Sequence, residues 1–234
     1  MICLAFDTSA KVASVAVLDG EKLLASYSVD NGLTQSELIL PMAEDVLKKL
    51  SLSYSDVGLL ATSVGPGSFT GVRIGVSLVK GLAFGKNIPC VGVSTIEALA
   101  ENLSGLSGII IPVMDARRNQ VYTATFNSDG EKLTRLTEDR ALSLSDLAEE
   151  LKSTDKPIYL VGDGYGVAKA ALCGLGVRTE NTPKVLINEN AASVGLVALR
   201  KFESGEAVSD SDISPIYLRL PQAERERLER LGNK

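Results

Sequence analysis

The chain has 234 residues, of which 45% are hydrophobic and 23% charged, values that suit one large domain or two small lobes and argue against disorder. Its formal net charge of −5 argues against a protein that binds nucleic acid through its overall field, because neutralising phosphates needs clustered Lys and Arg. The absence of histidine excludes Ser–His and Cys–His catalytic pairs and histidine-built metal sites.

The first hundred residues alternate between strand-like and helix-like segments. Short apolar runs predict three antiparallel strands at residues 2–6, 12–18 and 21–29, and Asp19-Gly20 is a hairpin signal. Residues 35–50 predict a helix, because apolar residues recur there at helical spacing. These apolar residues are Leu38, Leu40, Met42, Ala43, Val46, Leu47 and Leu50. The remaining expected elements are a strand at 57–64, a helix at 71–86, a strand at 89–93 and a helix at 95–103 capped by Ser94. The predicted order is βββαβαβα.

The second half repeats this outline without repeating the sequence. Residues 102–108 are the best candidate for a lobe boundary, because they are rich in Gly and Ser. The following segments predict a strand at 109–114, a hairpin of 119–126 and 131–137 around the turn 127–130, a helix opened by Ser143, a strand at 157–161 and a helix at 190–203. We therefore expect two α/β lobes, 1–104 and 105–234, and a single doubly wound sheet is the competing architecture. The tail 204–234 either packs back on the first lobe or stays with the second, and the sequence does not decide between them.

Residues 65–75 read Gly-Pro-Gly-Ser-Phe-Thr-Gly-Val-Arg-Ile-Gly and are the most distinctive segment of the chain. They match neither phosphate-loop pattern: Gly71 is followed by Val-Arg rather than Lys-Ser/Thr, and the glycine spacing is one residue too long for a dinucleotide fingerprint. Two interpretations stay open. The loop either presents backbone N–H groups to an anion at a helix N-terminus capped by Ser68 or Thr70, or is only a tight strand-to-helix turn.

Small residues recur along the helix that follows this loop. Ser77, Gly81 and Gly85 form one stripe, and Gly71 and Gly75 form a second. Glycine inside a helix costs about 1 kcal/mol relative to alanine, so its repetition predicts the close approach of another backbone. That backbone belongs either to the chain's own sheet or to a helix of a second protein, and the sequence does not decide between them.

Polar turns follow the first strand of each half. Asp7-Thr8-Ser9 suits a metal-bound phosphate or, more simply, a turn that bonds its own backbone. Residues 115–118, Asp-Ala-Arg-Arg, lie at the corresponding place in the second half, where arginine suits an anion. Neither turn forms a catalytic constellation by itself.

The cysteines and the N-terminus predict a cytoplasmic protein. Cys3, Cys90 and Cys173 are far apart and odd in number, which is typical of reduced thiols rather than disulfides or a zinc site. Asp7 interrupts the stretch where a signal peptide would be apolar, and no uninterrupted apolar run is long enough to span a membrane.

Five motifs in order resemble the bacterial TsaB (YeaZ) family of tRNA threonylcarbamoyladenosine biosynthesis proteins. They are Phe6-Asp7-Thr8-Ser9, the loop 65–75, Gly92-Val93-Ser94-Thr95, Met114-Asp115-Ala116-Arg117 and Pro215-Ile216-Tyr217-Leu218-Arg219. The resemblance implies a two-lobed actin/sugar-kinase/Hsp70-like (ribonuclease-H-like) fold. The sequence departs from the family's pattern at Gln35-Ser36, where members of the family often carry His-Ser.

The resemblance also implies a function. The chain would be a non-catalytic scaffold that pairs with TsaD, and with the ATPase TsaE, in the transfer of a threonylcarbamoyl group to the adenosine beside the anticodon of tRNA. It would form a homodimer without TsaD and meet tRNA only within the complex. No catalytic residue, metal or required cofactor is expected, and weak binding of ATP, ADP or Mg²⁺ stays open. The alternative is a stand-alone small-molecule kinase or peptidase of the same superfamily.

Two residue sets follow from these arguments. The expected partner surface consists of Gly71, Gly75, Leu78, Gly81, Leu82, Gly85, Leu38 and Met42. A degenerate anion or nucleotide cleft would be formed by Asp7, Thr8, Ser9, Gly65, Gly67, Ser68, Thr70, Arg73, Asp115 and Arg117.

Overall fold

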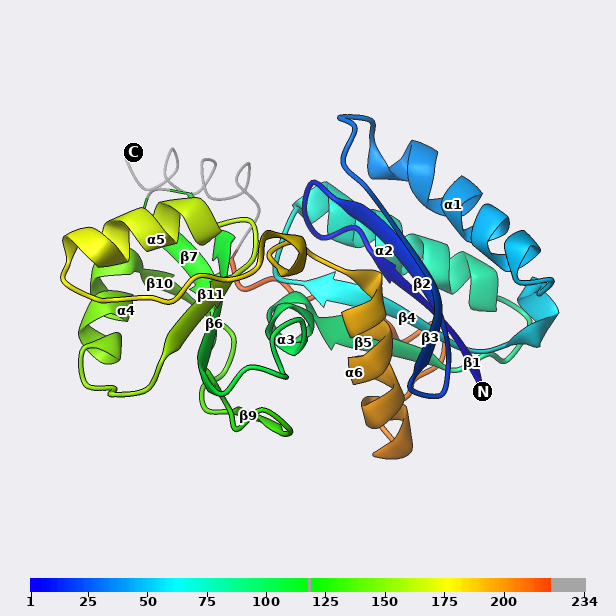
Figure 1. Ribbon diagram of the computed structural model, residues 1–234. Coiled ribbons are helices and arrows are strands. Elements are labelled where there is room, and N and C mark those ends of the chain that lie inside the picture. Colours follow the sequence, from blue (N-terminus) through cyan, green and yellow to red (C-terminus); the bar gives the residue numbers. More distant parts are fainter. Residues whose placement is uncertain (118, 220–234) are drawn as a thin grey trace, which may run out of the picture.

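The computed structural model describes residues 1–117 and 119–219. The first half of the chain forms a five-stranded sheet (Figure 1). Its strands are β1 (Ile2–Asp7), β2 (Ala13–Asp19), β3 (Lys22–Val29), β4 (Val57–Gly65) and β5 (Cys90–Ser94), in the order β3-β2-β1-β4-β5. The first three are antiparallel, and β4 and β5 run parallel to β1. Asp19 pairs with Lys22, so the predicted hairpin turn is confirmed.

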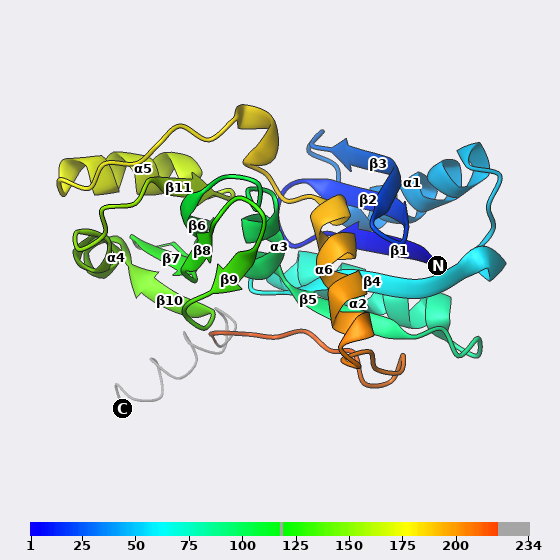
Figure 2. The same ribbon diagram turned by 60° about the horizontal axis from the view of Figure 1, so that its bottom comes forward.

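Helices cover both faces of this sheet because β1 is apolar on both. Leu4 and Phe6 pack in a core with helices α1 (Gln35–Lys49) and α2 (Phe69–Ala83). Cys3 and Ala5 point the other way and pack against α6 (Ala191–Glu203), which comes from the far end of the chain (Figures 1 and 2). The first lobe therefore draws on both ends of the sequence, and a boundary at residues 104/105 stays a prediction.

The second sheet is centred on β6 (Gly108–Asp115). Its other strands are β7 (Gln120–Thr123), β8 (Phe126–Ser128), β9 (Leu133–Arg135), β10 (Arg140–Ser143) and β11 (Ile158–Val161). The hydrogen-bonded pairs are β6 with β7, β8 and β11, β8 with β9, and β10 with β7. Helices α4 (Leu144–Leu151) and α5 (Tyr165–Gly174) pack with Ile111 and Val113 in one core. Two short 3₁₀ turns are η1 (Tyr54–Asp56) and η2 (Lys184–Leu186).

Helix α3 (Thr95–Glu101) lies between the two sheets and belongs to the packing of both lobes (Figure 1). Its Ile96 and Leu99 share a buried cluster with Ile110 and Phe126 of the second sheet. Its Ala98 packs with the first-sheet face that α6 covers. Because α3 makes apolar contacts with both sheets, it connects the two lobes.

The structure corrects several predicted boundaries. The strand expected at 119–126 is broken between β7 and β8, although its pairing with the following strand is confirmed by β8 and β9. Helix α5 and strand β10 were not predicted. Helix α2 begins at Phe69 rather than 71, because the Ser68 side chain caps it by accepting from Gly71 N at 3.2 Å, and it ends at Ala83 rather than 86.

The core-facing positions of α1 also differ from the prediction. Ile39 is buried, whereas Leu40, expected on the apolar face, is 38% exposed. The predicted caps Ser94 and Ser143 are confirmed, since each side chain accepts a backbone N–H of its helix. No helix within the described ranges is long and apolar enough to cross a membrane.

Candidate functional site

A cleft of about 510 Å³ opens between the two lobes. It is walled by the turn after β1, the glycine loop before α2, the end of β6 and residues 216–219. Of the expected cleft residues, Ser9, Gly67, Ser68, Asp115 and Arg117 line it. The others, Asp7, Thr8, Gly65, Thr70 and Arg73, do not line it.

Asp7 ends β1 and is almost fully buried, at 1% exposure. Its Oδ1 accepts hydrogen bonds from Ser9 N at 2.9 Å, Ser9 Oγ at 2.6 Å and Ser63 Oγ at 2.9 Å. Its Oδ2 is buried without a hydrogen-bond partner in residues 1–117 and 119–219. Burial raises the pKa of this carboxyl, because the charged form loses its hydration. The contacts of Asp7 are therefore those of a local turn tied to the neighbouring strand.

Glu189 lies close enough to two other carboxyl groups, those of Asp7 and Asp163, for their charges to affect it. Glu189, in the loop before α6, is 3% exposed, and its pKa is raised to about 8, first by burial and then by the charges of Asp7 and Asp163. Asp163 follows β11, and its Oδ1 accepts from Asp115 N at 3.0 Å. Desolvation raises the pKa of Asp163 as well, and the charge of Asp115 adds to this. Among the described residues, no group of three such side chains is placed to hold a metal ion.

The sequence offered different signals for these two acids. Asp163 lies in a Gly-Asp-Gly segment directly after the strand predicted at 157–161. Glu189 carries no local pattern at all, because its burial results from contacts with residues far away in the sequence.

The glycine loop packs against the chain's own turn. A Cβ at Gly67 would lie 2.4 Å from Ser9 O, and one at Gly71 would lie 2.0 Å from Thr8 O. Thr8 Oγ1 donates to Gly71 O at 2.7 Å, and Ser68 N donates to Ser9 O at 2.6 Å. The loop therefore needs glycine for close backbone approach, as the tight-turn interpretation requires.

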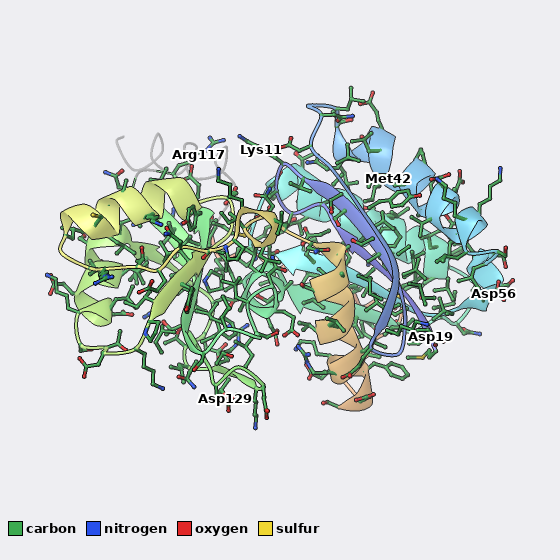
Figure 3. The ribbon with its side chains drawn as sticks, in the orientation of Figure 1. Lys11, Asp19, Met42, Asp56, Arg117 and Asp129 are labelled. Carbon is green, nitrogen blue, oxygen red and sulfur yellow. The ribbon has the colours of Figure 1, made fainter. Side chains whose placement is uncertain are left out.

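Charged side chains of both signs surround the cleft. Lys11 and Arg117 reach the opening from opposite lobes (Figure 3), and Arg219 lines it as well. Arg117 has a positive φ of 61°, and its N–H donates to Asp115 Oδ1 at 2.7 Å. With Asp115 and Asp163 at the same cleft, the acids offset part of this positive charge.

Arg73 was expected in the cleft but lies at its outer side. Its guanidinium lies 3.8 Å from the ring centre of Phe69, and its Nε donates to Tyr217 Oη at 2.8 Å. This contact joins the first turns of α2 to the segment that follows α6.

The expected partner surface divides into buried and exposed parts. The side chain of Met42 is buried in the core of the first lobe. Three leucines are half-buried against this core, and they are Leu38, Leu78 and Leu82. Gly75 lies against the side chains of Thr62 and Thr8. Gly81 and Gly85 are exposed, with open space where a Cβ would be. Sequence reasoning missed three exposed apolar side chains on these elements, Leu33 just before α1, Leu40 within α1 and Phe84 at the end of α2. A groove of about 470 Å³ lies next to this surface, between Ser36 of α1 and the first turns of α2.

Comparison with known proteins places the chain in a family. The family model described as "TsaD: tRNA N6-adenosine threonylcarbamoyltransferase" matches residues 34–226. The TsaB protein of Bacillus subtilis, named for tRNA threonylcarbamoyladenosine biosynthesis, is 32% identical over 98% of this chain and 99% of its own length. The chain belongs to the TsaB family. The TsaB of Escherichia coli is 30% identical over 94% of this chain and 95% of its own length.

Solved structures confirm the predicted fold of this TsaB-family chain. YeaZ from Pseudomonas aeruginosa superposes with a TM-score of 0.77 at 26% identity, covering 93% of this chain and 99% of its own. The ROK hexokinase of Thermus thermophilus, at 12% identity and a TM-score of 0.50 over 88% of this chain, shares the fold alone. The fold is the two-lobed actin/sugar-kinase/Hsp70-like one.

Proposed function

We propose that this chain is a non-catalytic subunit in tRNA threonylcarbamoyladenosine biosynthesis, where it pairs with TsaD and acts together with TsaE. The similarity to TsaB proteins over nearly the whole chain is the observation that carries the pathway. The match to a TsaD-family model supports a shared ancestry with the proposed partner.

The chemistry of the cleft supports a role without catalysis. The sequence has no histidine to act as a general base or metal ligand. Oδ1 of Asp7 already accepts hydrogen bonds from Ser9 and Ser63. Backbone oxygens of the chain itself lie where side chains of the loop glycines would be. Burial favours the neutral form of Glu189, which makes it a poor cation ligand at neutral pH.

The exposed side of α1 and α2 is the surface that we propose for TsaD, and for a second copy of the chain when TsaD is absent. It combines apolar Leu40 and Phe84 with the open space at Gly81. A helix approaching Gly81 could come closer than any side chain there would permit. We propose that tRNA is bound only by the assembled complex.

Reconstitution tests the proposed function. Threonylcarbamoyladenosine in tRNA is measured with TsaD and TsaE in the presence and absence of this chain. We expect no product from the chain alone and a large loss of product when it is withheld. Equal product with and without the chain would overturn the role.

A bulky substitution tests the surface separately. Gly81→Leu should abolish co-purification with TsaD while the variant stays folded by circular dichroism. Gly166→Leu is the matched control, because Gly166 is also an exposed glycine in a helix with open space around it, on the other lobe. Equal TsaD binding by the two variants would rule out this surface.

A further inference from the structure

The segment after α6 runs from the first lobe across to the second. Residues 208–219, which we call the strap, are separated from the end of α6 at Glu203 by residues 204–207 and pass along the edge of the first sheet toward the second sheet (Figure 2). Its last four residues, 216–219, form one wall of the cleft between the lobes.

The strap is fixed to the first lobe at several points. Val208 and Cys90 exchange two backbone hydrogen bonds, of 2.8 and 2.9 Å. Ile213 is 3% exposed and packs in the core that contains α1 and α2. Ile216 N donates to Val64 O at 2.7 Å. Backbone pairing and apolar burial together make this attachment stronger than a contact made by a single side chain.

Near its end, at Ile216 and Tyr217, the strap rests on the N-terminal part of α2 and on the glycine loop before it. The ring centres of Tyr217 and Phe69 are 4.9 Å apart, and Tyr217 Oη accepts the hydrogen bond from Arg73 Nε. A Cβ at Gly65 would lie 2.5 Å from Ile216 O, so the glycine loop leaves the space through which the strap passes.

Within residues 208–219, the strap contacts the second lobe through the side chain of Arg219. The guanidinium of Arg219 donates to Ala116 O at 3.3 Å and to Gln120 Oε1, and it lies 5.5 Å from the ring centre of Tyr122. The two acceptors and the ring belong to the residue after β6 and to β7, on the opposite side of the cleft from the glycine loop.

We propose that the strap sets the width of the inter-lobe cleft and that Arg219 is its releasable end. The lobes are connected behind the cleft by α3, which packs against both sheets. Release of Arg219 would remove this contact with the second lobe while residues 208–217 stay attached to the first lobe, and we infer that the second lobe could then rotate about α3. The strap thus holds the cleft closed independently of any partner, and the inference does not depend on the proposed function.

Distance measurement by pulsed electron resonance tests the strap. Cys173 on α5 is exposed and Cys3 and Cys90 are buried, so one spin label attaches to native Cys173 and a second to Glu44→Cys, at an exposed position of α1. The labelled protein is diluted into excess unlabelled protein, so that distances between two copies of the chain do not contribute. The labels lie on opposite lobes. We expect one narrow distance distribution for this reference protein, and Arg219→Ala should increase the population of longer distances about fivefold, the change for loss of about 1 kcal/mol.

Three further variants make the result specific. Gln120→Ala removes an acceptor from the other side of the same contact and should also lengthen the distances. Arg219→Lys keeps the charge but not the planar fork, so it should fall between the reference and Arg219→Ala. Arg178→Ala, an exposed arginine of the second lobe, should match the reference. Unchanged distances in both Arg219→Ala and Gln120→Ala, or a broad distribution already in the reference, would overturn the proposal.

Discussion

Glu189→Gln should stabilise the protein at high pH and have little effect at low pH. The pKa of Glu189 is raised from 4.5 to about 8 by burial and by the neighbouring acids, so folding strongly favours the protonated carboxyl. Each pKa unit corresponds to 1.36 kcal/mol, which makes the full cost of keeping this carboxyl buried at high pH about 5 kcal/mol.

The sign of the pH dependence follows from the raised pKa. The stability contributed by the buried, protonated group is complete below pH 4.5 and is lost as the pH rises from 4.5 through 8. By linkage the cost in the unmodified protein is about 1 kcal/mol at pH 5 and about 4 kcal/mol at pH 8. The amide of glutamine is neutral throughout, so the variant's advantage should grow by about 3 kcal/mol over this range.

Urea unfolding at pH 5, 6, 7 and 8 measures this difference as the free energy of unfolding. Glu203→Gln is the matched control, because Glu203 is an exposed glutamate at the end of α6, and it should follow the unmodified protein at every pH. If the unfolding curves show two transitions, or if the m-values of Glu189→Gln and the unmodified protein differ, the two-state treatment does not hold and each transition is compared by itself. Parallel curves for Glu189→Gln and the unmodified protein would refute the assignment of a buried, protonated carboxyl.

Two further predictions follow from glycine packing and from thiol burial. Gly71→Ala should lower the unfolding midpoint, because its Cβ would lie 2.0 Å from a backbone oxygen, whereas Gly81→Ala should raise stability by about 1 kcal/mol since the added methyl meets open space. Equal midpoints in thermal unfolding would contradict the packing. Only Cys173 should react quickly with a thiol reagent at pH 8, because burial raises the pKa of Cys3 to about 12 and of Cys90 to about 11. Mass spectrometry that finds rapid modification of a second thiol would contradict this.

The sequence predicted best those elements whose signals are local. The order βββαβαβα and the caps Ser94 and Ser143 depend on periodicity and on one hydroxyl near a helix start, and both are confirmed. Helix α5 was missed because glycine occurs at Gly166 and Gly174 and only Ala168 and Leu172 are buried, which leaves little apolar periodicity to detect. The break between β7 and β8 has no local signal in the chain.

The candidate site was predictable only in part, because much of it depends on distant contacts. The turn at Asp7 and the glycine loop were recognised as unusual, and the structure brings them together over more than fifty residues. Glu189 and Arg219 depend on contacts between segments that no short window joins. A motif such as residues 215–219 marks a segment as special without showing which lobe it contacts.

The glycines of α2 show how the structure separates causes that look the same in the sequence. Gly71 and Gly75 are required by the chain itself, because Thr8 and Thr62 occupy the space of a side chain. Gly85 follows the helix with a φ of 70°, a left-handed backbone conformation that glycine adopts without steric strain, so no partner is needed to explain it. Gly81 lies within the helix, is exposed, and meets nothing among the described residues. Its cost to helix stability therefore has no compensation inside the described chain, which is why Gly81 is the sharpest position at which to test for a partner.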